Sequence, residues 1–196
     1  MAEHWYGPIL NSLLGALVAA WSVYYFGVRQ LVAQRRLGFV ERQLTEFYAP
    51  LAGLRKQIRA KSELSLRISS AADGAWRDIC NSYGGQLVHD HEARFAQFKK
   101  IIDDENDQLK NEIVPMYRQM LALFTERYHL ADLETRAFYE GFLEFVELWN
   151  RWLVDSLPAE VVERLDHRED KVKPFYDHLE ARVKALQEQI AKGKAG

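Results

Sequence analysis

Cysteine is nearly absent from this chain of 196 residues, which contains only Cys80. A single cysteine cannot form a disulfide within the chain, so the sequence excludes a disulfide framework and agrees with a reducing compartment. Alternation of apolar and polar side chains over the length of a strand is also missing, whereas apolar residues recur at helical intervals along most of the chain. These two features predict an all-α protein.

The short motifs of common enzymes and metal sites are missing as well. The chain has no HExxH, no EF-hand loop, no Walker loop, no GxSxG elbow and no CxxC pair. Serine, histidine and aspartate residues are present, but their spacing indicates no catalytic triad. We therefore predict that the protein is not an enzyme and uses no cofactor.

The segment HDHE, residues 89–92, is the densest group of metal-ligating residue types. On a helix His89 and Glu92 lie on one face, but a third ligand would have to come from another segment, such as the acidic residues 103–108. We interpret HDHE as a helix N-terminus that carries favourable negative charge. A metal enzyme that uses His89 is the alternative, and it requires metal in the purified protein.

A long apolar run near the start is the most prominent feature that the chain does have. Residues 9–26 contain no ionisable side chain except two tyrosines, and as a helix they span roughly 27 Å, close to the ~30 Å of a hydrocarbon core. Aromatic residues flank both ends of the run, as at membrane interfaces. We therefore predict a transmembrane helix over residues 9–27, a short external tail over residues 1–8, and the lipid bilayer as a partner.

Two other interpretations of the apolar run lead to different proteins. A cleaved signal peptide is disfavoured, because no lysine or arginine precedes the run and bulky Trp21 follows the small residues Ala19 and Ala20. A buried helix of a soluble bundle stays open, because three polar residues dilute the apolar run, namely Asn11, Ser12 and Ser22.

Basic residues follow the apolar run, and none but His4 precedes it. Positive charge favours the cytosolic side, so we predict a single-pass protein with its N-terminus outside and its C-terminal domain in the cytosol, in a bacterial inner membrane. The arginines that indicate this orientation are Arg29, Arg35 and Arg36.

Small side chains at intervals of four form stripes within the predicted transmembrane helix. Such stripes let membrane helices approach closely and associate, although composition alone also produces them. They predict a homo-oligomer that associates through Ser12, Gly15, Ala16, Ala19 and Ala20.

Residues 28–67 read as a basic juxtamembrane helix with a coiled-coil seam. Between Arg29 and Arg67 nine lysines or arginines face three glutamates, a balance of +6, whereas the chain from Ile68 onward has a balance of −7. Pro50 interrupts the seam and predicts either a kink or the start of a second helix, of which we favour the kink. The seam is a second reason to expect oligomers, and it consists of Leu37, Val40, Leu44, Phe47, Leu51, Leu54 and Ile58.

The basic side chains of this helix are candidates for contact with an anionic lipid or ligand, although a solvated helix face is the interpretation that we favour. Nucleic acid is not an expected partner, because the segment has charge but no known module or aromatic platform. The candidate residues are Arg29, Arg35, Arg36, Arg55, Lys56, Arg59 and Lys61.

The remainder, residues 68–192, reads as a bundle of long, kinked helices, with a frayed tail over residues 193–196. Glycines in NSYGGQ, residues 81–86, predict a loop, and Pro115 predicts a second bend. An aromatic stripe at helical spacing predicts a buried helix face formed by Phe138, Phe142, Phe145, Trp149 and Trp152.

Two functions agree with these features. The first is a noncatalytic, membrane-anchored interaction or scaffold protein, whose cytosolic helical domain docks a protein partner or a second copy of itself. The alternative is a membrane effector or sensor, whose cytosolic domain binds an anionic small ligand or lipid and then rearranges the anchor helices.

Overall fold

We describe a computed structural model of the chain, which covers residues 6–82, 91–154, 156–165 and 168–194. Every regular element in these ranges is helical, which confirms the predicted all-α class. Two π-helical turns occupy Leu44–Tyr48 and Leu109–Ile113, and two short 3₁₀ turns occupy Tyr128–Leu130 and Glu169–Lys171. The α-helices are α1 (Tyr6–Gln43), α2 (Ala49–Ser82), α3 (His91–Gln108), α4 (Val114–Glu126), α5 (Leu133–Arg136), α6 (Tyr139–Leu153), α7 (Ala159–Val162) and α8 (Lys173–Lys194).

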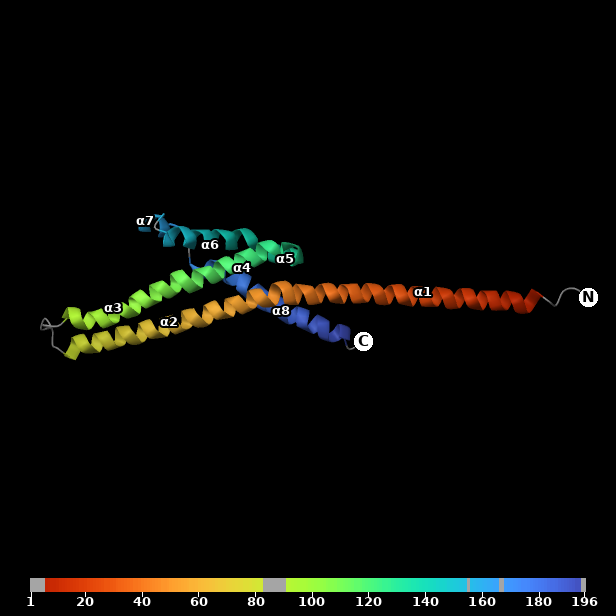
Figure 1. Cartoon of the computed structure of the whole chain (residues 1–196), viewed down its shortest axis with the longest axis horizontal. Coiled ribbons are helices and arrows are strands. Elements are labelled where there is room, and N and C mark those ends of the chain that lie inside the picture. The colour runs from red at the N-terminus through yellow and green to blue at the C-terminus, as the bar shows by residue number, and fades with distance from the viewer. Residues whose placement is uncertain (1–5, 83–90, 155, 166–167, 195–196) are drawn as a thin grey trace, which may run out of the picture.

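Helices α1 and α2 follow each other as one long, gently bent rod (Figure 1). Helices α3 and α4 return along α2, α6 packs on α4, and α8 packs against both α1 and α2 where those helices meet. One end of the rod, the N-terminal part of α1, projects beyond the bundle. The other end pairs with α3 to form a two-helix arm that points the opposite way (Figure 1).

Pro50 and Pro115 each follow a π-helical turn. A proline lacks the backbone N–H and clashes with the preceding turn of an α-helix. Here the residue before each proline, Ala49 or Val114, donates its N–H to the carbonyl five residues earlier, that of Leu44 or Leu109. The inserted residue widens the turn, so the helix continues through Pro50 and Pro115. Pro50 therefore bends one continuous helix and does not separate two.

The hydrophobic core lies where α2, α4, α6 and α8 meet. Phe124 is fully buried at its centre, and its ring lies 5.4 Å from that of Phe47 and 5.6 Å from that of Phe175, centroid to centroid. The predicted aromatic stripe packs into this core with Phe142 and Phe145 buried, but Trp152, at 37% exposed, lies at its edge. Phe138 and Trp149 are partly buried and pack against the same core, so the predicted face lies toward the core but is fully buried only at Phe142 and Phe145.

The coiled-coil seam of residues 37–58 is used inside the chain. Phe47, Leu51 and Ile58 are fully buried, and Val40, Leu44 and Leu54 pack against the same core. The seam contacts α4 and α8 of its own chain, so it offers no free face to a second copy. The heptads are therefore not a reason to expect an oligomer.

The predicted transmembrane helix is not supported by the structure. Among the described residues, no helix combines the length and the apolar character that crossing a bilayer requires. Residues 9–27 lie within α1, but most side chains of that range, including all those up to Ala16, lie outside the described ones. From Arg29 onward charged residues interrupt the apolar sequence of α1.

Candidate functional site

A polar network joins the π turn of Leu44–Tyr48 to α5 and α8. Asp132 caps the N-terminus of α5, where its carboxylate Oδ1 accepts from the backbone N–H of Thr135 at 2.8 Å. The π turn directs Tyr48 toward the same point, and α8 contributes the remaining two members. We call Tyr48, Asp132, Thr135, His178 and Arg182 the junction network.

The hydroxyl of Thr135 is the centre of the network and is fully buried. It donates its single hydrogen to Asp132 Oδ1 at 2.6 Å. The hydroxyl of Tyr48, at 2.8 Å, and Nε2 of His178, at 2.7 Å, must therefore both donate to Thr135. The backbone N–H of Asp132 in turn donates to the Tyr48 hydroxyl at 3.2 Å. Every group of this buried set thus has a partner, and His178 carries a proton on Nε2.

The charge of Asp132 is stabilised by its neighbours. Burial acts to raise the pKa of Asp132, but hydrogen bonds from Thr135 and the charge of Arg182 outweigh it, so this pKa lies below its usual value. Nε of Arg182 lies 2.6 Å from Asp132 Oδ2. Burial also raises the pKa of Tyr48, which keeps that hydroxyl protonated.

The threonine, histidine and aspartate of the network do not form a catalytic triad. Activation of a hydroxyl needs an unprotonated histidine nitrogen facing it, but His178 presents a protonated Nε2 to Thr135. Asp132 lies 3.8 Å from that same Nε2 and so does not orient the ring through its other nitrogen. Thr135 is also sealed from any substrate. The network is therefore a structural link between the π turn of Leu44–Tyr48, α5 and α8.

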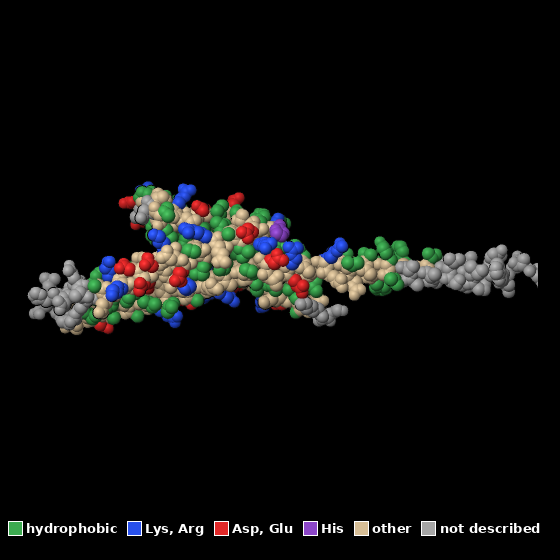
Figure 2. Space-filling model, in the orientation of Figure 1, with side chains coloured by type: hydrophobic (Ala, Val, Ile, Leu, Met, Phe, Trp, Pro, Cys, Tyr) green, Lys and Arg blue, Asp and Glu red, His purple; other side chains and the backbone are tan. Residues whose placement is uncertain are grey.

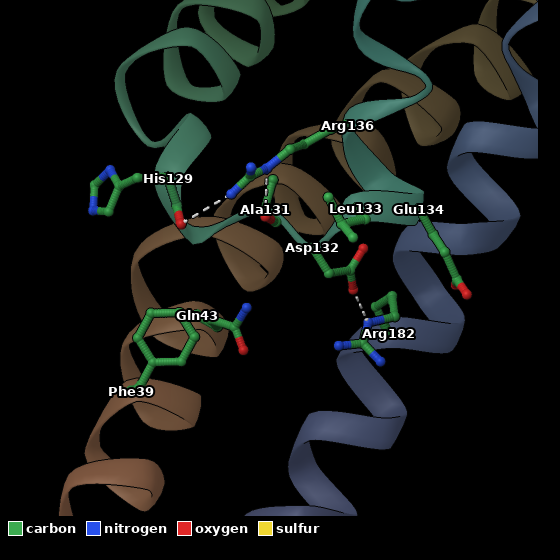
Figure 3. Close-up of a pocket in the computed structure, with 9 residues that line it drawn as sticks. All are labelled: Phe39, Gln43, His129, Ala131, Asp132, Leu133, Glu134, Arg136 and Arg182. Carbon is green, nitrogen blue, oxygen red and sulfur yellow. Dashed lines mark hydrogen bonds and ion pairs between the residues drawn. The ribbon is translucent and has the colours of Figure 1, made fainter.

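An open pocket of about 510 Å³ lies beside the network (Figure 3). Its back wall is held by hydrogen bonds to backbone carbonyls: Gln43 Nε2 donates to Leu130 O at 2.7 Å, and Arg136 Nε donates to Ala131 O at 2.9 Å. We call it the junction pocket, and its lining consists of Phe39, Gln43, His129, Ala131, Asp132, Leu133, Glu134, Arg136 and Arg182.

The basic residues predicted to bind an anion lie on α1 and α2, and most of those on α2 have acidic partners. Arg55 pairs with Glu169 at 2.6 Å and stacks on the ring of Tyr176, whereas Arg59 pairs with Glu63. Lys61 pairs with Glu112, and Lys56 lines a pocket together with both acidic and basic side chains. An anionic ligand at this cluster stays a prediction without independent geometric support.

The remaining predicted site residues lie on α1. Arg29, Arg35 and Arg36 are exposed on its projecting part, and Arg29 lies over the ring of Tyr25 at 4.5 Å. The residues predicted for helix association fall in the range of α1 whose side chains lie outside the described ones, and they stay a prediction: Ser12, Gly15, Ala16, Ala19 and Ala20.

The metal alternative falls largely outside the described residues, because His89 and the side chain of Glu92 are both beyond them. Within the described ranges, no group of three or more histidine, cysteine, aspartate or glutamate residues is arranged to hold a metal ion. Cys80 is exposed near the end of α2.

The junction network and pocket were not predicted from the sequence. A local signal existed, because Asp132 and Thr135 have the spacing of a helix cap and its third helical residue. Their partners gave none, since Tyr48 precedes Thr135 by 87 residues and His178 follows it by 43.

No family model, curated protein or solved structure matches this chain. No functional residue is therefore carried over from another protein.

Proposed function

We propose that the protein is a noncatalytic interaction protein, held at a membrane by the N-terminal part of α1 and presenting its helical bundle to protein partners. The observation that carries this proposal is the exposed apolar surface of the projecting part of α1. Trp21, Val23 and Phe26 are 70%, 75% and 68% exposed, and Figure 2 shows apolar side chains on this part of the rod.

The apolar side chains surround α1, which favours lipid as their covering. Val23, Tyr24, Tyr25 and Phe26 are consecutive and all exposed, so they point in four directions around the helix. A helix that docks in a protein groove needs only one apolar stripe, whereas a helix in a bilayer is apolar on every side. The uncharged run of residues 9–26 in the sequence supports the same proposal.

The bundle supports the interaction role. Its two-helix arm has exposed apolar side chains, among them Leu64, Leu66 and Ile102, at 47%, 70% and 51%. Charged side chains of both signs are mixed over the visible face of the bundle, with no field of one sign that would suggest a nucleic acid (Figure 2). The sensor alternative is less favoured, because three of its four candidate residues on α2 are paired with acidic side chains of the same chain: Arg55, Arg59 and Lys61.

Extraction of membranes tests the tether. Membranes from cells that produce the full chain are washed with alkaline carbonate, which strips peripheral proteins, and we expect the protein to remain in the pellet. Replacing Leu17, Val23 and Phe26 with lysine should move it to the supernatant, because a lysine near the helix centre, as at Leu17, costs about 2.5 to 3.5 kcal/mol on insertion and the other two remove apolar side chains from the same span. The matched control replaces two exposed residues of the arm, Leu66 and Ile68, with lysine and should stay in the pellet.

The orientation can be read from Cys80, the one cysteine of the chain, which is exposed. A membrane-impermeant maleimide should label Cys80 in inverted vesicles and not in intact spheroplasts. Labelling of spheroplasts would refute the proposed cytosolic position of the bundle. Release of the unchanged chain by carbonate would refute the tether itself.

A further inference from the structure

The walls of the junction pocket are fixed before any ligand arrives. Gln43 and Arg136 are both tied to backbone carbonyls of residues 129–131, and Arg136 also lies over the ring of Tyr128 at 5.0 Å. Asp132 holds Arg182 on the opposite side through an ion pair. A site with fixed polar groups loses little conformational freedom on binding.

One positive charge of the pocket is not neutralised. Asp132 and Arg182 cancel each other, and both oxygens of Asp132 are already in use. Arg136 contacts only carbonyl oxygens and an aromatic ring and has no ion pair with any residue that the structure describes. Figure 3 shows the carboxylate of Glu134 on the far side of the pocket, extending away from Arg136. The Arg136 side of the pocket therefore favours an anion.

Apolar side chains form the rim. Phe39 on α1 is 46% exposed and Leu133 on α5 is 82% exposed, although both are large hydrophobic residues. Both line the pocket: Figure 3 shows Phe39 beside Gln43, and Leu133 beside Asp132. A site that combines a fixed arginine with an apolar rim resembles the centre of a protein interface, where arginine and aromatic residues are enriched.

We propose that the junction pocket binds an acidic peptide segment of a protein partner, with a carboxylate at Arg136 and a neighbouring apolar side chain between Phe39 and Leu133. This inference deepens the proposed function and rests on it for the kind of partner. A lipid headgroup is the less favoured ligand, because Phe39 lies 13 residues, or roughly 20 Å, beyond Phe26 along α1. That distance exceeds the thickness of a headgroup layer.

Peptide binding to the full chain in detergent micelles tests the proposal. The probe is a fluorescently labelled peptide of alternating leucine and glutamate, LELEL, followed by anisotropy beside its neutral analogue LQLQL. We expect LELEL to bind at least tenfold more tightly, and the difference to shrink in 0.5 M salt. Equal binding of the two peptides would overturn the proposal.

Leu133 allows a charge test, because its side chain is almost fully exposed and the Glu and Lys variants lose the same apolar contact, so the difference between them reports charge. Leu133→Glu should weaken LELEL binding about fivefold and Leu133→Lys should strengthen it about fivefold, the effect of one charge near 4 Å in water. The same changes at Leu66, 70% exposed on the arm, are the matched control and should alter nothing. Arg136→Gln should abolish the preference for LELEL, and the Leu133 pair keeps the test valid if that variant misfolds.

Two outcomes separate this proposal from its alternatives. If vesicles of phosphatidylglycerol displace LELEL and Leu133→Glu weakens both ligands alike, the pocket binds anionic lipid and the peptide proposal fails. If carbonate releases the chain from membranes but LELEL still binds in a manner that depends on Leu133, the tether fails and the pocket proposal stands.

Discussion

Removal of the Thr135 hydroxyl is the sharpest test of the junction network. Thr135→Val keeps the shape of the side chain but deletes an atom that bonds to Tyr48, Asp132 and His178 at 2.8, 2.6 and 2.7 Å. The buried Tyr48 hydroxyl then loses its partner at 2.8 Å and keeps only the carboxylate of Asp132 beside it, so we expect a cost of about 1 to 3 kcal/mol. Asp132 also loses a charge-assisted bond, whereas His178, which is partly exposed, regains water. We expect a total loss of about 3 kcal/mol in the free energy of unfolding.

The assay is urea unfolding of the full chain in mild detergent, followed by tryptophan fluorescence. Urea unfolding gives the loss of about 3 kcal/mol directly as a change in the free energy of unfolding. In a separate thermal unfolding experiment the same loss corresponds to a fall in Tm of roughly 6 to 12 °C for a domain of this size. Thr45→Val is the matched control, because the Thr45 hydroxyl is exposed and bonds only to the carbonyl of Glu41, and it should cost less than about 0.5 kcal/mol.

A double-mutant cycle then identifies the cause. Tyr48→Phe alone should cost about 1.5 kcal/mol, since it removes the acceptor of the Asp132 N–H. The pair Tyr48→Phe with Thr135→Val should cost about 1 kcal/mol less than the sum, because no unpaired hydroxyl remains. Additive costs, or a Thr135→Val cost no greater than that of the control, would refute the hydrogen-bond assignment.

Three further predictions concern the charge of Asp132, the centre of the core and the association of copies through α1. Burial acts to raise the pKa of Asp132, but its bonds to Thr135 and the Arg182 charge lower it below 3.8, so its ionised form stabilises the fold above about pH 4 and this contribution is lost as the pH falls through the lowered pKa. The stability gap between the wild type and Asp132→Asn, measured by urea unfolding, should therefore be smaller at pH 3 than at pH 6.5, and an equal gap would contradict the assignment. Phe124→Ala should cost about 3 to 5 kcal/mol and Trp152→Ala, at the edge of the core, less than half as much; similar costs would show that the core centre is misplaced. Replacing Gly15 and Ala19 with leucine should reduce cross-linking between copies in membranes if small residues mediate association, and undiminished cross-linking would argue against that surface.

Much of the fold could be predicted because helical periodicity is a local property of the sequence. The recurrence of Phe142, Phe145 and their neighbours was sufficient to locate α6 and its buried face. The effect of Pro50 was only partly predictable, since the rule that proline breaks a helix does not show where an extra residue is inserted to relieve the clash.

The junction pocket could not be predicted because it depends on tertiary contacts. Tyr48 and His178 reach Thr135 from distant parts of the chain, and neither residue belongs to a recognisable motif. At the heptad seam the sequence predicted an association that the structure does not use in that way. The pattern is typical of coiled coils between chains, but its residues pack against helices of the same chain. Periodicity identifies an apolar face but not the surface that covers it.

Helices α1 and α2 and the π turn between them form one continuous helical rod, which makes this part of the molecule long and stiff. From Gly27 to Ser82 the helix rises about 80 Å with no flexible joint, because both ends of the π turn continue in helix. If the N-terminal part of α1 crosses a bilayer, the end of the arm formed by α2 and α3 is held at a fixed distance from the membrane and in a fixed direction. A partner bound at the end of the arm and another bound close to the membrane would then be kept a fixed distance apart, so the protein would act as a molecular spacer.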